Sequence, residues 1–243
     1  MICRLPLNSY HHVKNNKRML FAPSVMQQHQ QQHKVNNPTF FSTTTPSPPF
    51  RKIGIVGLGL MGHGICQVAA TAAASLKSNN ESSSSSPSII AYESEEIFLL
   101  KGMERIDNSL TKLVQKEKMS QEDATKTWNT IKFTTDINEL SSNTDLIIEA
   151  IIENMDLKNK LYKELDVICP KSTIFASNTS SLSISEMSNI VSNERKSNFL
   201  GLHFFNPVQI MKLVEVIKTP YTNQESFDKL YNWVNYINKA PVT

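Results

Sequence analysis

The chain has 243 residues, of which 40% are hydrophobic, and its formal net charge is +3. This length suits one full domain with tails, and the apolar content is sufficient for a substantial core. No apolar run reaches the roughly 18 residues of a membrane span, and the small charge does not indicate nucleic-acid binding. Cys3, Cys66 and Cys169 are too few and too widely spaced for a disulfide framework or a paired-ligand metal site, so we expect a reducing compartment and no metal.

Residues 1–50 are basic, contain no Asp or Glu, and are rich in Ser, Thr, Asn, Gln and His. Organellar transit peptides have this composition, whereas a secretory signal needs a continuous apolar segment. We therefore predict a disordered leader that is a mitochondrial transit peptide and directs the protein to the matrix. The alternative is a plain disordered tail, because residues 27–32 are a polar, low-complexity tract.

The β-branched run from Lys52 to Val56 leads into a glycine turn at residues 57–62 (GLGLMG), and apolar residues at helical spacing follow it. This order predicts a strand, a phosphate-binding turn and a helix. Gly57 would permit the tight turn, Gly59 would let a pyrophosphate approach the backbone, and Gly62 would let helix and strand pack closely.

A second apolar run, Ile89 to Glu93, ends on an acid that could accept a hydrogen bond from the adenosine ribose. A carboxylate there accepts from a 2′-hydroxyl and repels a 2′-phosphate, so NAD is predicted over NADP. The separation from Gly62 exceeds the usual value of about 20 residues, which we attribute to a low-complexity loop at residues 77–88. The alternative for Glu93 is a solvated acid at a strand end.

A helical hairpin is predicted next. Residues 95–118 read as a long amphipathic helix, and Ser120 begins a capping box that opens a second helix through Trp128. The apolar stripe of the first helix is expected to consist of Ile97, Leu100, Met103, Ile106, Leu110 and Leu113.

The rest of the chain alternates apolar, β-rich runs with helical stretches near 155–166, 183–192 and 223–238. The predicted strands are 131–134, 145–151, 173–176, 199–204 and 213–217. This alternation predicts an α/β fold over residues 51–243, a Rossmann-like, doubly wound and largely parallel sheet with the helical hairpin as an insertion. Ligands of such a sheet bind beyond the carboxyl ends of the strands.

Polar residues follow three of these strands, so we expect them to converge on one edge of the sheet. They are Glu149 and Glu153, the segment 177–181 (SNTSS), and His203 with Asn206. The serine-rich segment has an alternative role, because Ser181 or Ser183 could cap the following helix.

His203 and Glu215 form a candidate catalytic pair. An imidazole titrates near neutral pH, and a carboxylate that accepts its second N–H fixes its tautomer and stabilises the imidazolium. Glu215 lies in an otherwise apolar strand, where a buried carboxylate would need such a partner. The alternative is a structural histidine.

From Lys52 to Thr243 the chain resembles the L-3-hydroxyacyl-CoA dehydrogenase family of fatty-acid β-oxidation. Four motifs carry the resemblance, namely residues 57–65 (GLGLMGHGI), 148–154 (IEAIIEN), 177–182 (SNTSSL), and 203–208 (HFFNPV) with 211–216 (MKLVEV). The resemblance implies an NAD-dependent enzyme that acts on an acyl-CoA thioester.

The resemblance also implies roles for single residues. His203 would remove the 3-hydroxyl proton, Glu215 would orient it, and Ser180 would hydrogen-bond the substrate oxygen. The residues at positions that contact NAD are Glu93, Glu153, Lys158 and Asn206. Those at positions that meet coenzyme A are Ser109 and Lys116, with Lys112 and Lys118 as alternatives for the lysine.

The sequence departs from the family pattern in two respects. Glu93 stands where the family more often carries Asp. Family members continue past residues 239–243 into a helical domain with another active-site asparagine and much of the dimer interface, so we expect that domain to be missing and the homodimer to be compromised. The alternative functions are therefore a catalytically impaired NAD-binding or partner-binding fragment, or a related dehydrogenase of a non-CoA hydroxy acid.

Overall fold

The computed structural model describes residues 48–77 and 87–243. The predicted transit peptide, apart from its last three residues, and most of the low-complexity loop lie outside the described residues. Within the described part, eight strands form one sheet in the order β3-β2-β1-β4-β5-β6-β7-β8. The strands are β1 (Lys52–Val56), β2 (Ser88–Tyr92), β3 (Ile131–Thr134), β4 (Leu146–Glu149), β5 (Ile174–Ser177), β6 (Phe199–Phe204), β7 (Leu213–Ile217) and β8 (Ala240–Val242).

Every neighbouring pair of strands is parallel except β6 and β7, which run antiparallel. The predicted α/β class and the largely parallel sheet are confirmed. The short strand β8 was not predicted, because a run of three residues that contains Pro241 has a weak strand pattern.

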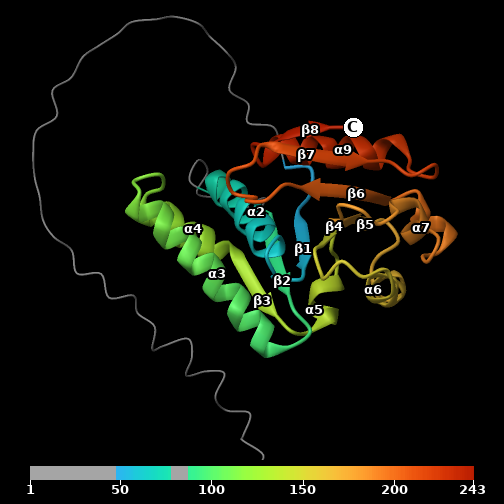
Figure 1. Cartoon of the computed structure of the whole chain (residues 1–243), viewed down its shortest axis with the longest axis horizontal. Coiled ribbons are helices and arrows are strands. Elements are labelled where there is room, and N and C mark those ends of the chain that lie inside the picture. Colours follow the sequence, from blue (N-terminus) through green and yellow to red (C-terminus); the bar gives the residue numbers. More distant parts are fainter. Residues whose placement is uncertain (1–47, 78–86) are drawn as a thin grey trace, which may run out of the picture. The chain divides into compact units, whose positions relative to one another are not determined.

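Helices cover both faces of the sheet. One apolar core joins the sheet to α2 (Gly62–Lys77), α3 (Glu96–Gln115), α4 (Gln121–Thr130) and α9 (Gln224–Tyr236). The other joins it to α5 (Ile137–Ser141), α6 (Met155–Ile168) and α7 (Ile184–Ser188), while the short α8 (Asn193–Lys196) precedes β6. In Figure 1, α2, α3 and α4 lie side by side, and α6 and α7 lie across the sheet from them. The doubly wound arrangement is therefore confirmed.

Several helices begin where a side chain caps the first turn. The Ser120 hydroxyl accepts the Asp123 N–H, as the predicted capping box requires, and Asn154 caps α6 in the same way. Ser183, not Ser181, caps α7 by accepting the Glu186 N–H. Ser180 and Ser181 therefore do not cap this helix.

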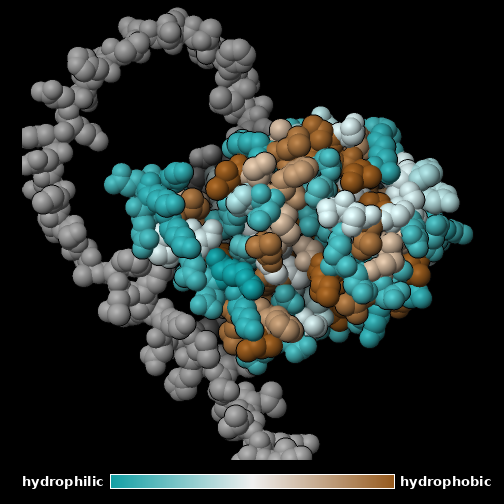
Figure 2. All heavy atoms as spheres, viewed as in Figure 1, coloured by the Kyte–Doolittle hydropathy of each residue, from teal (hydrophilic) through white to brown (hydrophobic). Residues whose placement is uncertain are grey.

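The predicted apolar stripe of α3 is wrong in part. Ile106 and Leu110 are buried as expected, but the remaining buried positions are Leu99 and Gly102. Ile97 and Leu100 are exposed, and Figure 2 shows hydrophobic residues gathered at the lower end of this helix in the view. The helix packs so closely at Gly102 that a Cβ there would lie 2.4 Å from the Leu58 side chain. The contact therefore requires a glycine. A sequence pattern of apolar residues does not detect a glycine at the centre of a contact face.

Among the described residues, no helix is long and apolar enough to cross a membrane. The same residues contain no cluster of His, Cys, Asp or Glu suited to a metal ion.

Candidate active site

The glycine turn after β1 has the backbone that was predicted. Gly57 has φ +87°, a conformation that side chains rarely adopt, and its N–H donates to the Tyr92 carbonyl of β2 at 3.0 Å. A Cβ at Gly62 would lie only 1.7 Å from the Gly57 carbonyl oxygen, whereas a Cβ at Gly59 would meet no atom within 4 Å. Packing therefore accounts for Gly62 but not for Gly59, and the open space above Gly59 fits a phosphate at the N-terminus of α2.

Glu93 follows β2 directly and faces this turn. Its Oε1 accepts the Leu58 N–H at 2.5 Å. Burial raises the pKa of Glu93, and the hydrogen bond from Leu58 and the charge of Arg105 offset part of this effect. Arg105 of α3 also donates to the Leu58 carbonyl at 3.3 Å. Turn and acid together fit the adenosine half of a dinucleotide. No sequence pattern pointed to Arg105.

His203 and Glu215 lie directly opposite each other in the antiparallel pair β6 and β7. The His203 Nδ1 is 2.7 Å from the Glu215 Oε2, which leaves Nε2 as the ring nitrogen that can act as a base. The predicted pairing is therefore observed. The predicted burial of Glu215 is wrong, because 42% of its side chain is exposed against 18% for His203. Among the described strands, β8 with its three residues is the one beyond β7.

The carboxyl ends of the central strands are level with one another, since Val56 pairs with Glu149 and Glu149 pairs with Ser177. Beyond β5, the Asn178 N–H donates to the Glu149 carbonyl at 2.8 Å, and its Oδ1 accepts the Phe204 N–H of β6 at 3.0 Å. Asn178 thus joins three strand ends. The predicted convergence on one edge is observed.

Ser180 is held by Glu153, which follows β4. The Glu153 Oε1 accepts the backbone N–H groups of Ser180 at 3.1 Å and Ser181 at 3.4 Å, together with the hydroxyl of Thr179. Burial raises the pKa of Glu153, but the Thr179 hydrogen bond and the Lys158 charge outweigh it and leave the pKa below the usual value. Glu153 is therefore an ionised carboxylate that orders this loop.

The sequence matches the family described as "3-hydroxyacyl-CoA dehydrogenase, NAD binding domain" over residues 52–243. The chain belongs to this family. The domain is an NAD-binding one, so the predicted cofactor is confirmed, and the glycine turn with Glu93 fits it.

Relatives of the chain carry names that agree with the family. Human mitochondrial hydroxyacyl-coenzyme A dehydrogenase is 40% identical over 83% of this chain and 63% of its own length. The 3-hydroxybutyryl-CoA dehydrogenase of Clostridioides difficile is 37% identical over 79% of this chain and 62% of its own length. The crystal structure of (S)-3-hydroxybutyryl-CoA dehydrogenase from Ralstonia eutropha superposes with a TM-score of 0.72 at 34% identity, over 80% of this chain and 63% of that one. The chain therefore spans less than two thirds of each of these relatives.

Two further residues that were predicted to contact NAD, Lys158 and Asn206, differ in their exposure. The Lys158 side chain is 0% exposed, and its ammonium makes an ion pair with Glu149 and lies 3.6 Å from Glu153 Oε2. The contact between Lys158 and NAD stays a prediction. Asn206 is exposed beyond β6 and remains accessible to a ligand.

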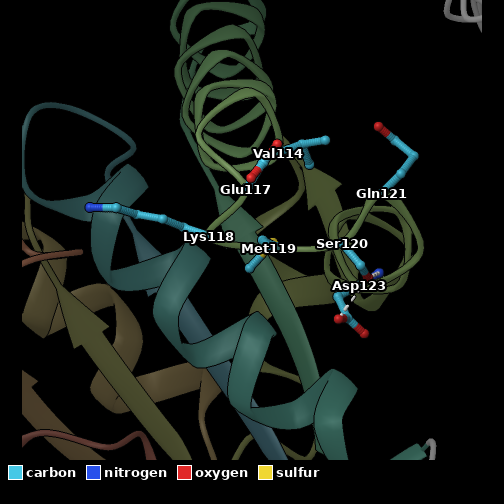
Figure 3. A pocket seen from close by; sticks show the side chains of 7 residues that line it. All are labelled: Val114, Glu117, Lys118, Met119, Ser120, Gln121 and Asp123. Atoms are coloured by element: carbon cyan, nitrogen blue, oxygen red, sulfur yellow. Dashed lines mark hydrogen bonds between the residues drawn. The ribbon is translucent and has the colours of Figure 1, made fainter. Parts of the chain in front are cut away.

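The two predicted coenzyme A residues lie on α3, away from the His203 pair. Ser109 is half-buried, and Lys116 is exposed at the position that ends the helix. The predicted helix extended three residues too far at its C-terminal end, because Glu117 has a positive φ and closes it. Figure 3 shows the shallow pocket at the following turn, where Lys118 points away from Gln121 and Asp123. No hydrogen bond or ion pair among the described residues joins Ser109 or Lys116 to His203 or Glu215.

Proposed function

We propose that this chain takes part in NAD-dependent oxidation of L-3-hydroxyacyl-CoA to 3-oxoacyl-CoA in fatty-acid β-oxidation. The observation that carries the proposal is the His203–Glu215 pair at the same edge of the sheet as the dinucleotide turn. The names of the relatives supply the substrate class, a 3-hydroxyacyl thioester.

The side chains support each proton movement that the reaction requires. With Nδ1 donating to Glu215, the Nε2 of neutral His203 is free to accept the proton of the 3-hydroxyl group. The Glu215 carboxylate then stabilises the imidazolium that results. Ser180 would hydrogen-bond the same substrate oxygen. Bound NAD supplies the acceptor for the hydride that leaves C3.

The experiment is the reverse reaction on purified protein, followed by loss of NADH absorbance with acetoacetyl-CoA. Reduction of the thioester but not of free acetoacetate supports the proposal. Turnover of the free acid alone would favour a dehydrogenase of non-CoA hydroxy acids. Tight NADH binding without turnover of either compound would favour a binding fragment.

The coenzyme A contact is proposed to lie on the face of α3 that carries Ser109 and Lys116. Replacement of Lys112, Lys116 or Lys118 by Met removes one cation at a time. Replacement of the lysine that meets a phosphate should raise the KM for acetoacetyl-CoA several-fold without changing the KM for NADH. Lys160→Met on α6 is the matched control, because Lys160 is also an exposed helical lysine.

We also propose a mitochondrial matrix location. The support is the acid-free, basic leader together with the mitochondrial name of the human relative. Incubation of the full chain with isolated mitochondria should yield a shortened, protease-protected product. A full-length product that remains accessible to protease would contradict the proposal.

A further inference from the structure

Lys239, which follows α9 and directly precedes β8, is a buried lysine that none of the roles proposed above uses. It is 8% exposed, and its ammonium donates to the carbonyl oxygens of Val208 and of Met211, the second at 2.7 Å. Its backbone N–H donates to the Val234 carbonyl of α9 at 3.1 Å. The side chain therefore reaches from the segment between α9 and β8 to the connection between β6 and β7.

The Lys239 ammonium makes no ion pair with any carboxylate among the described residues. Burial, and then the charge of Lys212, lower the pKa of Lys239. Withdrawal of an ammonium from water is costly, and neutral carbonyls offset less of that cost than a carboxylate does. Stability alone is therefore a weak reason for a lysine here, and the backbone that it binds is the better explanation.

The two carbonyls that Lys239 binds belong to one turn, residues 207–211, which we call the β6–β7 turn. Inside it, the Pro207 carbonyl accepts the N–H groups of Ile210 at 3.0 Å and of Met211 at 2.9 Å. The ammonium adds a second set of contacts, to the carbonyls of residues 208 and 211. One side chain from a distant part of the chain thus holds both halves of this turn.

The β6–β7 turn also packs against the start of α2, the helix that follows the glycine turn. A Cβ at Gly64 would lie 2.8 Å from the Val208 Cβ, and Val208 is buried. The Gln209 side-chain amide donates to the Gln67 Oε1 at 3.2 Å. The turn therefore contacts α2 through its side chains and Lys239 through its carbonyls.

We propose that Lys239 is a positioning residue that holds the β6–β7 turn against α2 and so fixes Asn206 and the His203–Glu215 pair relative to the glycine turn. Asn206 directly precedes the turn, and His203 and Glu215 lie on the two strands that the turn joins. A shift of the turn along α2 would move the base relative to a cofactor bound at the glycine turn. The effect on turnover rests on the proposed function, but the link between Lys239 and the turn does not.

Removal of the ammonium should loosen the β6–β7 turn and leave the rest of the sheet intact. In Lys239→Met the Val208 and Met211 carbonyls lose this donor, whereas Lys239→Arg retains a cation with several N–H donors and should restore most of the order. Lys212→Met is the matched control, because the Lys212 ammonium donates to the Asn238 carbonyl at 3.0 Å and joins the same two segments from the exposed surface.

Amide hydrogen exchange, measured by NMR on the whole chain, tests the link without any substrate. We expect Lys239→Met to speed exchange of the Ile210 and Met211 amides by about tenfold, as local opening predicts. The amide of Ile55, in the central strand β1, should be unchanged. Lys239→Arg should lie close to the wild type, and Lys212→Met should match it.

Nuclear Overhauser effects between the Val208 methyl groups and the Gly64 α-protons report the position of the turn on α2, and they should weaken in Lys239→Met. If this variant does not fold, Lys239→Gln, which keeps an amide donor but no charge, should show the same two changes to a smaller extent. Exchange rates and Overhauser effects equal to those of the wild type in a folded variant would overturn the proposal.

Turnover of acetoacetyl-CoA measures the effect on the site. For Lys239→Met we expect kcat to fall by about tenfold, because a small displacement of the base is costly, whereas loss of stability alone would leave the kcat of the folded protein unchanged. A loosened turn with wild-type kcat would also overturn the proposal. Absence of turnover in the wild-type chain would count against the proposed function alone, because the NMR measurements need no substrate.

Discussion

His203 and Glu215 are register partners on neighbouring antiparallel strands, and Nδ1 of the first lies 2.7 Å from Oε2 of the second. Side chains directly opposite each other in such a pair are held together by the backbone ladder itself. The imidazole therefore needs little further support to keep one tautomer, although the carboxylate is partly exposed.

Replacement of this base should abolish most turnover. For His203→Ala we expect kcat to fall by about 10²–10⁴-fold, the usual contribution of a general base, with NADH affinity nearly unchanged. The kcat of Glu215→Gln should lie between that of His203→Ala and that of the wild type, because an amide still orients the ring but does not stabilise an imidazolium. Steady-state kinetics with acetoacetyl-CoA and fluorescence titration with NADH give the two quantities. Activity of His203→Ala close to that of the wild type would exclude the assigned role.

Two glycines of the turn should respond differently to alanine. Gly59→Ala places a Cβ in open space, so the protein should fold normally but bind NADH at least about tenfold more weakly, since the new methyl group occupies the approach of the phosphate. Gly62→Ala drives a Cβ into the Gly57 carbonyl and should destabilise the fold by about 1–3 kcal/mol. Thermal unfolding and NADH titration of both variants separate the effects. Equal loss of stability in the two would contradict this reading of the turn.

NADH affinity should depend on the ionisation of Glu93. The pKa of this acid is raised by its burial, so as the pH is lowered it becomes protonated earlier than an ordinary glutamate. A protonated carboxyl is a poorer acceptor for ribose hydroxyls, and affinity should therefore fall as the pH drops through this raised pKa. Titrations with NADH between neutral and mildly acidic pH measure the effect.

Glu93→Gln should weaken NADH binding by about tenfold, as expected for a hydrogen bond to a charged group, and should flatten this pH dependence. It should also reduce the preference for NADH over NADPH, because the charge that repels a 2′-phosphate is gone. Glu96→Gln, which removes a nearby exposed acid of α3, is the matched control. A variant at Glu93 that retains the wild-type pH profile would assign the titration to another group.

Asp166 is expected to stabilise the fold, not the site. It accepts from Arg195 at 2.9 Å and from the Ser192 N–H at 2.8 Å, and Arg195 is fully buried. Burial raises the pKa of Asp166, but these donors outweigh it and lower the pKa below the usual value. The stabilisation is therefore complete above the unfolded-state pKa of about 3.9 and is lost as the pH falls through the lower folded-state pKa.

Asp166→Asn should accordingly reduce the free energy of unfolding by about 3 kcal/mol at pH 7, since it leaves a buried guanidinium without its anion. The difference from the wild type should shrink only at pH values below about 4. Urea unfolding across a pH series measures it, with Asp107→Asn on the exposed side of α3 as the control. A difference independent of pH down to the acid limit of the fold would show that charge is not the cause.

Features that depend on short stretches of chain were well predicted. The strand, glycine turn and helix at residues 52–77 follow from local needs, namely β-branched residues, a positive φ at Gly57 and close approach at Gly62. The opposition of His203 to Glu215 follows from two strand runs separated by a short connection. The predictions failed where the outcome depends on distant packing, as at the buried Leu99 and Gly102 of α3, the second of which lies against Leu58.

The sequence by itself determined the α/β class, the NAD-type turn with its acid, and the identity of the candidate base, because spacing along the chain sets each of them. The tertiary structure decided which charges are buried. Glu149 and Lys158 are withdrawn from water because α6 packs over the end of β4 beside Ser177 of β5, whereas Glu215 stays half-exposed because, among the described strands, only the short β8 lies beyond β7. Burial of a charge depends on every element around it, and no single segment of the sequence specifies that environment.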